Sequence, residues 1–310
     1  MMDIHCKLLV IGGGPGGYAC AARAGELGVD TLLVESRRIG GTCLNVGCIP
    51  SKALIHAADE YARARVFAAG GDIGIATGPA TLDMAAVMAW KDGIVGRLNG
   101  GVAGLLKSAG VKTLDGSARF RDGKTVEVQT STGLQVVRAE TIVIATGSAP
   151  VALPGLPFGD DVLSSTEALA LTEVPERLAV VGAGYIGLEI GTAYAKLGAD
   201  VTVVEAEDRI LPQYDAELTR PVAQRLKTLG IETLLGAQAR GKVAGALLVE
   251  TGDGGERRVP ADKILVTVGR RPRTDGWGLE ELALEMDGAA VRIDERCRTS
   301  MRGVHAIGDV

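Results

Sequence analysis

The sequence predicts an α/β protein of two domains, each built on a parallel β-sheet. Three observations lead to this prediction: a glycine-rich motif occurs twice, an acidic residue follows both copies at the same distance, and the chain is long enough for two domains. It has 310 residues, of which 46% are hydrophobic, enough for two sizeable cores. Strand–turn–helix–strand units of this kind are typical of Rossmann-like nucleotide-binding domains.

The first copy lies near the start of the chain. An apolar run of strand length at 7–11 precedes Gly12-x-Gly14-x-x-Gly17, and after a helical stretch a second apolar run ends at Glu35. In such a unit the first glycine permits a sharp turn, the second lets the backbone approach a pyrophosphate, and the third lets the helix pack on the strand. The acid is then expected to accept hydrogen bonds from ribose hydroxyls.

The second copy repeats this arrangement. A buried-strand pattern precedes Gly182-x-Gly184-x-x-Gly187, and the next one ends at Glu205, as far from its first glycine as Glu35 is in the first copy. The matched spacing makes two ligand-free turns a poor alternative and predicts two nucleotide units.

Acidic residues after the second unit predict which nicotinamide nucleotide binds there. Glu205, Glu207 and Asp208 place negative charge where a 2′-phosphate would lie, and Arg209 is the only nearby cation. NAD is therefore expected in preference to NADP.

Turn-forming residues predict the remaining elements. Residues 52–110 are expected to be mostly helical with a glycine-rich break near 70–80, while 111–140 and 231–260 are expected to form hairpins. Each nucleotide unit has a later strand, at 141–146 and at 264–268. A helix is expected at about 215–229, with Asp215 as N-cap and Gly230 just beyond its end.

Composition and charge exclude several classes of function. The net charge of −5, the pI near 5.4 and the 3% aromatic content argue against a nucleic-acid partner. No apolar run is long enough for a membrane span, so no membrane association is expected. The chain enters a strand almost at once, which predicts no signal peptide, and Cys6, Cys20 and Cys297 are scattered as in a reducing cytosol. A cytoplasmic location is expected.

Cys43 and Cys48, in the segment GGTCLNVGCIPSKAL, form a unit. In a regular helix their separation is a rise of about 7.5 Å, beyond the usual Cα distance of roughly 4.4–6.8 Å in a disulfide. Bridging them needs a distorted turn, for which Gly47 and Pro50 are suited. A structural disulfide would add little stability in so small a loop. A metal site lacks a second ligand pair, with His56 the only nearby histidine, so no metal is expected and a redox-active dithiol is favoured.

The same segment resembles the active-site signature of the flavoprotein disulfide reductases. Its residues around the two cysteines, Leu-Asn and Ile-Pro-Ser-Lys, are most similar to those of the dihydrolipoyl dehydrogenases. Glutathione and mercuric reductases share the Cys-x4-Cys spacing. The similarity continues through five further segments and covers the whole chain; these segments are 116–118, 142–148, 182–189, 268–272 and 305–310.

This resemblance implies a reaction, two cofactors and partners. The cofactors would be FAD and NAD, and the reaction would be the oxidation of dihydrolipoyl groups by NAD⁺. Electrons would pass from the substrate dithiol to the Cys43–Cys48 pair, then to FAD, then as hydride to NAD⁺. The implied partners are the lipoyl-bearing subunit of a 2-oxoacid dehydrogenase complex or of the glycine cleavage system, and a second copy of the chain in a homodimer.

The resemblance also implies roles for individual residues. Cys48 would lie against the flavin as a thiolate, Cys43 would exchange with the substrate, and Lys52 would sit near flavin N5 and pair with Glu189. The implied FAD contacts are Gly12, Gly14, Gly17, Glu35, Gly41, Thr42, Lys52, Gly116, Ala118, Ala145, Thr146, Gly147 and Asp309. The implied NAD contacts are Gly182, Gly184, Tyr185, Ile186, Gly187, Glu205, Ala239 and Gly269.

The expected FAD domain comprises 1–149 and 275–310, with the NAD domain at 150–274. Two residues depart from the family pattern: Arg273 stands where the family commonly has Asn, and Ala239 stands where it often has a larger apolar residue.

The family's catalytic His and its Glu partner belong to a C-terminal interface domain, which is expected to lie outside these 310 residues. His5, His56 and His305 are therefore not assigned as bases. The alternatives are a related flavoprotein disulfide or mercuric reductase, or a truncated FAD/NAD-binding fragment with only diaphorase activity.

Overall fold

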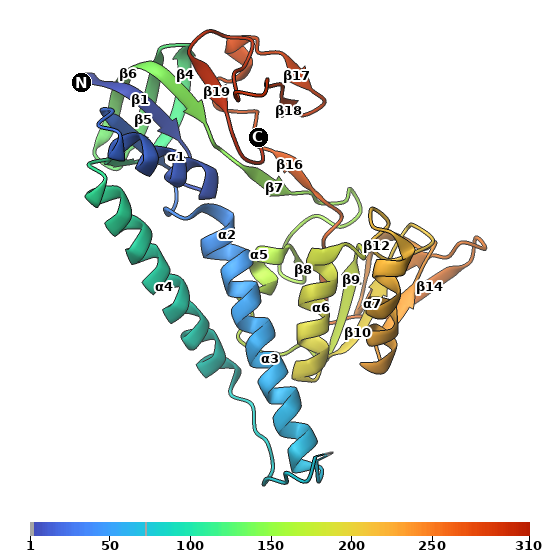
Figure 1. Cartoon of the computed structure of the whole chain (residues 1–310). Helices are drawn as coiled ribbons and strands as arrows, with labels where there is room; N and C mark the ends of the chain where they lie inside the picture. The colour runs from blue at the N-terminus through green and yellow to red at the C-terminus, as the bar shows by residue number, and fades with distance from the viewer. Residues whose placement is uncertain (1–2, 72) are drawn as a thin grey trace. The chain divides into compact units, whose positions relative to one another are not determined.

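The computed structural model describes residues 3–71 and 73–310, and it has the expected α/β architecture (Figure 1). The chain divides into two compact units. The first comprises Met1–Ile49, Val95–Ala149 and Arg270–Val310, and the second comprises Pro50–Ile94 and Pro150–Gly269. The long helices α3 and α4 each contribute residues to both units.

The first unit is built on a seven-stranded sheet in the order β3-β2-β1-β6-β5-β4, with β19 also paired to β6. Strands β3, β2, β1, β6 and β19 are parallel, whereas β4 and β5 extend the sheet as antiparallel hairpins. The main elements are β1 (Asp3–Ile11), α1 (Pro15–Glu26), β2 (Thr31–Glu35), α2 (Gly41–Val46), the first two residues of α3 (Cys48–Ala68), the C-terminal part of α4 (Met84–Ser108), β3 (Lys112–Asp115), β4 (Ser117–Asp122), β5 (Thr125–Thr130), β6 (Gly133–Ile144) and β19 (Val304–Ala306). Short elements complete it: β7 (Ser148–Pro150), β16 (Arg270–Pro272), the 3-10 helix η1 (Glu280–Leu282), β17 (Met286–Asp287) and β18 (Ala290–Val291).

The parallel strands of this unit are apolar on both faces because both faces are covered. Leu9 of β1 belongs to a core cluster on one face, and the next residue, Val10, packs on the other face with Ala21 and Ala22 of α1. Near-continuous hydrophobic runs are expected of such strands. The two cores therefore explain why the apolar runs in the sequence do not alternate.

The second unit contains a five-stranded, wholly parallel sheet in the order β11-β10-β9-β15-β8 and a separate antiparallel sheet in the order β12-β13-β14. Its elements are β8 (Val162–Leu163), α5 (Ser165–Ala168), β9 (Arg177–Val181), α6 (Tyr185–Leu197), β10 (Asp200–Val204), α7 (Ala216–Thr228), β11 (Glu232–Leu234), β12 (Gln238–Val243), β13 (Ala246–Glu250), β14 (Glu256–Pro260) and β15 (Lys263–Val266).

The segment Pro50–Ile94 belongs to the second unit, although the expected domain boundaries fell at 149 and 274. The reason is packing: Leu54 of α3 and Met88 of α4 are buried in the same core as Leu188 and Tyr194 of α6. A helix belongs to the unit whose core buries its apolar face. The order of the residues in the sequence did not predict that α6 buries the apolar faces of α3 and α4.

The expected secondary structure is confirmed in outline. Helices α3 and α4 flank the glycine-rich break, and both hairpin regions form antiparallel strands. The first strand of each hairpin region, β3 or β11, instead joins a parallel sheet. Strand β6 begins at Gly133, well before the expected 141.

Helix α7 has the expected ends, with Asp215 as its N-cap residue. It begins after Asp215, although the Asp215 side chain makes no capping hydrogen bond within the described chain. It ends just before Gly230, whose φ of 75° is the left-handed conformation that glycine adopts without strain. Among the described residues no helix is long and apolar enough to cross a membrane.

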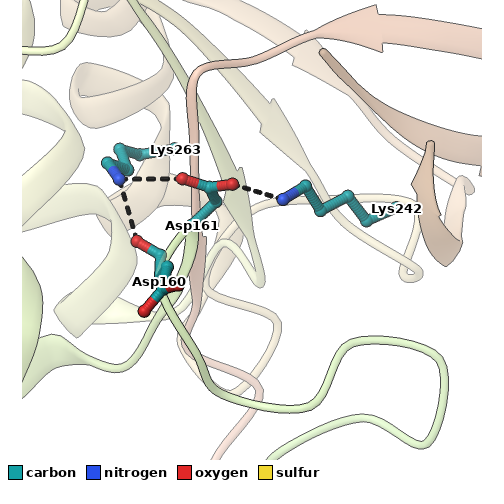
Figure 2. A network of polar contacts seen from close by, with 4 residues as sticks. All are labelled: Asp160, Asp161, Lys242 and Lys263. Atoms are coloured by element: carbon teal, nitrogen blue, oxygen red, sulfur yellow. Dashed lines mark hydrogen bonds and ion pairs between the residues drawn. The ribbon is translucent and has the colours of Figure 1, made fainter. Parts of the chain in front are cut away.

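A network of charges ties the start of β8 to two other strands of the second unit (Figure 2). Asp161 accepts hydrogen bonds from Lys242 of β12 and, at 2.9 Å, from Lys263 of β15. Lys263 also donates to the backbone carbonyl of Asp160 at 2.8 Å. The hydrogen bond from Lys242, followed by that from Lys263, lowers the pKa of Asp161 from 3.8 to about 2.

This network makes the free energy of unfolding of the second unit depend on pH. Because the folded-state pKa of Asp161 is depressed, the stabilisation is present above pH about 4 and declines as pH falls towards 2. Asp161→Asn should lower the urea midpoint at pH 7, and its difference from the parent chain should shrink as the pH falls from about 4 towards 2. Asp160→Asn is the matched control and should follow the parent chain. A difference that is constant with pH would contradict this assignment.

Candidate active site

The first glycine-rich turn excludes side chains at two of its three glycines. A Cβ atom at Gly12 would lie 2.2 Å from the carbonyl oxygen of Ala145, and one at Gly17 would lie 1.8 Å from the carbonyl oxygen of Gly12. At Gly14 the nearest atom, the Cα of Gly41, would be 3.9 Å away. Gly12 and Gly17 are therefore required by packing, while Gly14 leaves the start of α1 accessible.

The second turn repeats this pattern. A Cβ at Gly182 would lie 2.8 Å from the carbonyl oxygen of Thr267, and one at Gly187 would lie 2.4 Å from that of Gly182. At Gly184 no described atom lies within 4 Å. Both turns thus leave open space around the second glycine at a helix N-terminus, which is where phosphates bind.

The two acids hold the turns themselves. The Glu35 carboxylate accepts hydrogen bonds from the N–H of Gly13 at 2.7 Å and of Arg37 at 2.8 Å. The Glu205 carboxylate does the same with Ala183 at 2.6 Å and with the residue two positions beyond it at 3.0 Å. From the sequence, these acids are expected only to bind ribose hydroxyls. Their fixed distance from the glycines was the signal for this second role.

The carboxyl edge of the first sheet gathers several expected FAD contacts. Strands β1, β6 and β19 are neighbours and parallel, so the residues that follow them meet at one edge. The Asp309 carboxylate accepts a hydrogen bond from the Ser148 hydroxyl at 3.4 Å, and the Thr146 hydroxyl donates to the carbonyl of Arg273 at 3.0 Å. Ala145, Thr146, Gly147 and Asp309 therefore belong to the same edge as the first turn.

The link between β3 and β4 places two more expected FAD contacts. The N–H of Gly116 donates to the Glu35 carbonyl at 2.9 Å, and a Cβ there would lie 2.6 Å from the carbonyl oxygen of Gln129. Ala118 follows on β4, opposite Val128 of β5. Gly116 therefore lies at the end of β2, beside Glu35.

Arg273, one of the two residues that depart from the family pattern, has a defined place. Its N–H donates to the carbonyl of Gly147 at 2.8 Å, and its Nε donates to the carbonyl of Ser148 at 3.2 Å. Burial, and then the charges of Arg37 and Arg270, lower the pKa of Arg273. This arginine therefore supports the loop after β6 directly.

Lys52 and Glu189 form an ion pair in the second unit, between α3 and α6. The Lys52 Nζ lies 2.6 Å and 2.9 Å from the two carboxylate oxygens of Glu189. The side chains are 61% and 37% exposed, so the pair contributes only about 0–1 kcal/mol to stability. The pair therefore contributes little to the stability of the fold, but its two short contacts orient the Lys52 ammonium.

The other expected NAD contacts lie on different elements. Tyr185 and Ile186 begin α6, with Tyr185 exposed, and Gly269, with a φ of 139°, follows β15. Ala239 lies instead on β12, where it pairs with Val249 and packs against the core of the antiparallel sheet. The structure therefore brings Tyr185 and Ile186 to the second turn and places Ala239 in a separate sheet.

A disulfide joins Cys43 of α2 to Cys48, the first residue of α3, with their Cα atoms 4.5 Å apart. Gly47 separates the helices with φ −138° and ψ −107°, and a Cβ there would lie 2.9 Å from the carbonyl oxygen of Thr42. Pro50 lies in the first turn of α3, where its missing N–H costs no helical hydrogen bond. The distorted turn expected at Gly47 is present.

The remaining cysteines differ from this pair. Cys6, Cys20 and Cys297 are outside disulfides in the described chain, and burial raises the pKa of Cys6 to about 11, so its thiol is unreactive at neutral pH. Across residues 3–71 and 73–310, no group of three or more His, Cys, Asp or Glu side chains is arranged to hold a metal ion.

Comparison with known families agrees with this geometry. A family model described as pyridine nucleotide-disulphide oxidoreductase matches residues 6–310. The chain belongs to this family. The two Rossmann-like units and the redox-type cysteine segment predicted from the sequence are those of the family.

The chain is similar to named members of the family. It is 56% identical over 308 residues to the dihydrolipoyl dehydrogenase of Pseudomonas aeruginosa and 44% identical over 312 residues to that of Bacillus subtilis, covering 99% of this chain in both cases. It spans 66% of the length of these relatives. Among solved structures, the HOCl-induced flavoprotein disulfide reductase RclA from Escherichia coli is similar over 98% of this chain and 66% of its own length, with a TM-score of 0.83 and 27% identity.

Substitutions at the second turn should separate packing from nucleotide access. Gly187→Ala should cost about 1–3 kcal/mol of unfolding free energy, because its Cβ would meet the carbonyl of Gly182. Gly184→Ala should leave stability within about 1 kcal/mol, since its φ of −73° suits alanine, but should weaken NADH binding at least tenfold. Urea unfolding and fluorescence titration with NADH measure the two effects. Unchanged NADH affinity in Gly184→Ala would show that no phosphate approaches this glycine.

Proposed function

We propose that this chain contains the FAD- and NAD-binding parts of a dihydrolipoyl dehydrogenase, which oxidises dihydrolipoyl groups with NAD⁺. The observation that carries the proposal is the Cys43–Cys48 disulfide at the start of α3, in a chain that also has two dinucleotide-type turns. The 56% identity to a dihydrolipoyl dehydrogenase supports this substrate class over a more distant disulfide reductase.

The residues present fit both cofactors. The first unit would hold FAD through the Gly12–Gly17 turn, Glu35 and Asp309, because the turn is open at its second glycine and the acids lie at the same sheet edge. The second unit would hold NAD through the matching turn and Glu205. Bound FAD would supply the two-electron carrier between the cysteine pair and the nicotinamide.

The helix geometry supports distinct roles for the two cysteines. Cys48 is the first residue of the 21-residue helix α3, whose N-terminal dipole stabilises a thiolate. Cys43, on the short α2, would then be the thiol that exchanges with substrate. In the exchange the dihydrolipoyl dithiol becomes a cyclic disulfide, and the Cys43–Cys48 bond is reduced to two thiols, so two electrons and two protons move together.

Lys52 and Glu189 would position a cation for the reduced cofactor. The ammonium of Lys52 is held by both oxygens of one carboxylate, which fixes its position. A preorganised charge stabilises developing negative charge without reorganisation. This pair is proposed to favour reduction at the flavin ring.

The partners and location follow from the same proposal. A lipoyl-bearing subunit of a 2-oxoacid dehydrogenase complex or of the glycine cleavage system would deliver the dithiol, and the full-length protein would act as a cytoplasmic homodimer. Activity assays of the full-length protein compare the substrate classes. One assay measures the oxidation of dihydrolipoamide by NAD⁺, and two others measure the reduction of glutathione disulfide and of Hg²⁺ by NADH. Turnover of glutathione disulfide or Hg²⁺ that exceeds lipoyl turnover would overturn the proposal.

The thiolate assignment can be tested by spectroscopy. Anaerobic two-electron reduction of the flavin-bound chain should produce a long-wavelength absorption band from the Cys48 thiolate against the flavin. Cys48→Ser should abolish the band, while Cys43→Ser should retain it. A full band in Cys48→Ser would reverse the assignment of the two cysteines.

Nucleotide preference can be tested without disturbing the turn. Glu207 is exposed, and the turn is held by the side chain of Glu205 rather than by that of Glu207. Glu207→Arg should therefore leave the turn intact and shift the ratio of NADPH to NADH affinity at least tenfold towards NADPH. Glu205→Arg should instead weaken both nucleotides, because the N–H groups of Ala183 and Glu207 lose their acceptor. Equilibrium titration measures both affinities. Equal affinity of the parent chain for NADH and NADPH would exclude the predicted NAD preference.

A further inference from the structure

The sequence contains only two asparagines, Asn45 and Asn99, and they are hydrogen-bonded to each other. The Asn99 side-chain nitrogen donates to the Oδ1 of Asn45 at 2.7 Å. Asn45 lies on α2 between the two redox cysteines, and Asn99 lies on α4 within the first unit, only 8% exposed. A buried amide of this kind needs its partner, because it cannot exchange the lost hydrogen bond for one to water.

Asn45 in turn holds the backbone that leads into α2. Its side-chain nitrogen donates to the carbonyls of Arg38 at 3.2 Å, Ile39 at 3.1 Å and Gly41 at 2.9 Å. Helix α2 has only six residues, and its N-cap, Gly40, is in the left-handed conformation without a side-chain capping bond in the described chain. The Asn45 side chain therefore fixes the start of a helix that is too short to fix itself.

The hydrogen bond between the asparagines orients this arrangement. Three carbonyl acceptors require the nitrogen of Asn45 to face the loop, which leaves its Oδ1 towards α4, where Asn99 donates. Asn99 is further fixed by a bond to the carbonyl of Val95 at 3.4 Å. The contact thus links α2 and the loop before it to the part of α4 that lies in the same unit.

We propose that Asn99 is a positioning residue for the redox pair: through Asn45 it holds α2 in place and sets the balance between the Cys43–Cys48 disulfide and the two thiols. The inference deepens the proposed function and rests on it. In the disulfide form the covalent bond already restrains α2. In the dithiol form the glycine-rich loop is free to open unless Asn45 and Asn99 hold it, so their contact keeps the thiols close and favours the disulfide.

The test measures this balance directly. The purified chain is equilibrated anaerobically with mixtures of dithiothreitol and its cyclic disulfide, quenched with acid and alkylated. Mass spectrometry of the peptide that contains Cys43 and Cys48 then gives the fraction reduced, independently of the other cysteines. Asn99→Asp keeps the size of the side chain but cannot donate, and Asn99→Leu removes the polar group. Both should lower the equilibrium constant for disulfide formation about threefold to tenfold, the range expected for one hydrogen bond.

Matched variants keep the test decisive. Val102→Ala trims another residue of α4 that packs on the core of this unit, and it should leave the constant within twofold. If Asn99→Asp does not fold, Asn99→Ala also removes the donor, with a smaller side chain. A constant within twofold of the parent in the folded Asn99 variants, or an equal shift in Val102→Ala, overturns the proposal.

The outcome is separable from that of the proposed function. A full-length protein that forms the disulfide reversibly but oxidises no dihydrolipoamide would contradict the proposed function, while the Asn99 variants would still decide the positioning role. Normal lipoyl turnover with an unchanged thiol equilibrium in the variants would leave the function standing and reject the role of Asn99.

Discussion

The close approach of a helix to the turn that precedes it is the constraint on which both units depend. At Gly17 and at Gly187 a single added carbon would overlap the carbonyl oxygen of the first glycine of the same turn. Only a residue without a side chain lets α1 and α6 begin so near the ends of β1 and β9. The free N–H groups of each helix N-terminus are therefore presented at the carboxyl edge of a parallel sheet, where nucleotides bind in this fold.

The acids complete this arrangement in both units. Glu35 and Glu205 each give their two carboxylate oxygens to two backbone N–H groups, one in the turn and one just beyond the acid. A charged acceptor makes such bonds stronger than neutral ones and fixes the turn before a ligand arrives. The second turn has an additional support, since the Thr267 hydroxyl lies 3.1 Å from the carbonyl oxygens of Val181 and Gly182. The first turn has Ala145 at the corresponding strand end, which has no hydroxyl to make this contact.

The cysteine pair depends on a different physical device. Two helices meet at Gly47, and the break between them brings the two Cα atoms to 4.5 Å, whereas a continuous helix would separate them by a rise of about 7.5 Å along its axis alone. The same break places Cys48 at the N-terminus of α3, so one feature of the backbone permits the disulfide and also stabilises a thiolate. The polar contacts of Asn45 then hold the shorter helix, which has little stability of its own.

The sequence by itself determined the features that depend on local spacing. The turns, their acids, the broken helix at Gly47 and the pairs of strands around each turn follow from residues close together in the chain, whose geometry is set by backbone sterics and hydrogen bonding. The pairing of Lys52 with Glu189 was expected only from the resemblance to a known family. Contacts between distant residues required the tertiary structure. Asn99 lies 54 residues from Asn45, and Pro50–Ile94 packs with a sheet that follows it in sequence, because packing selects partners by shape and burial rather than by distance along the chain.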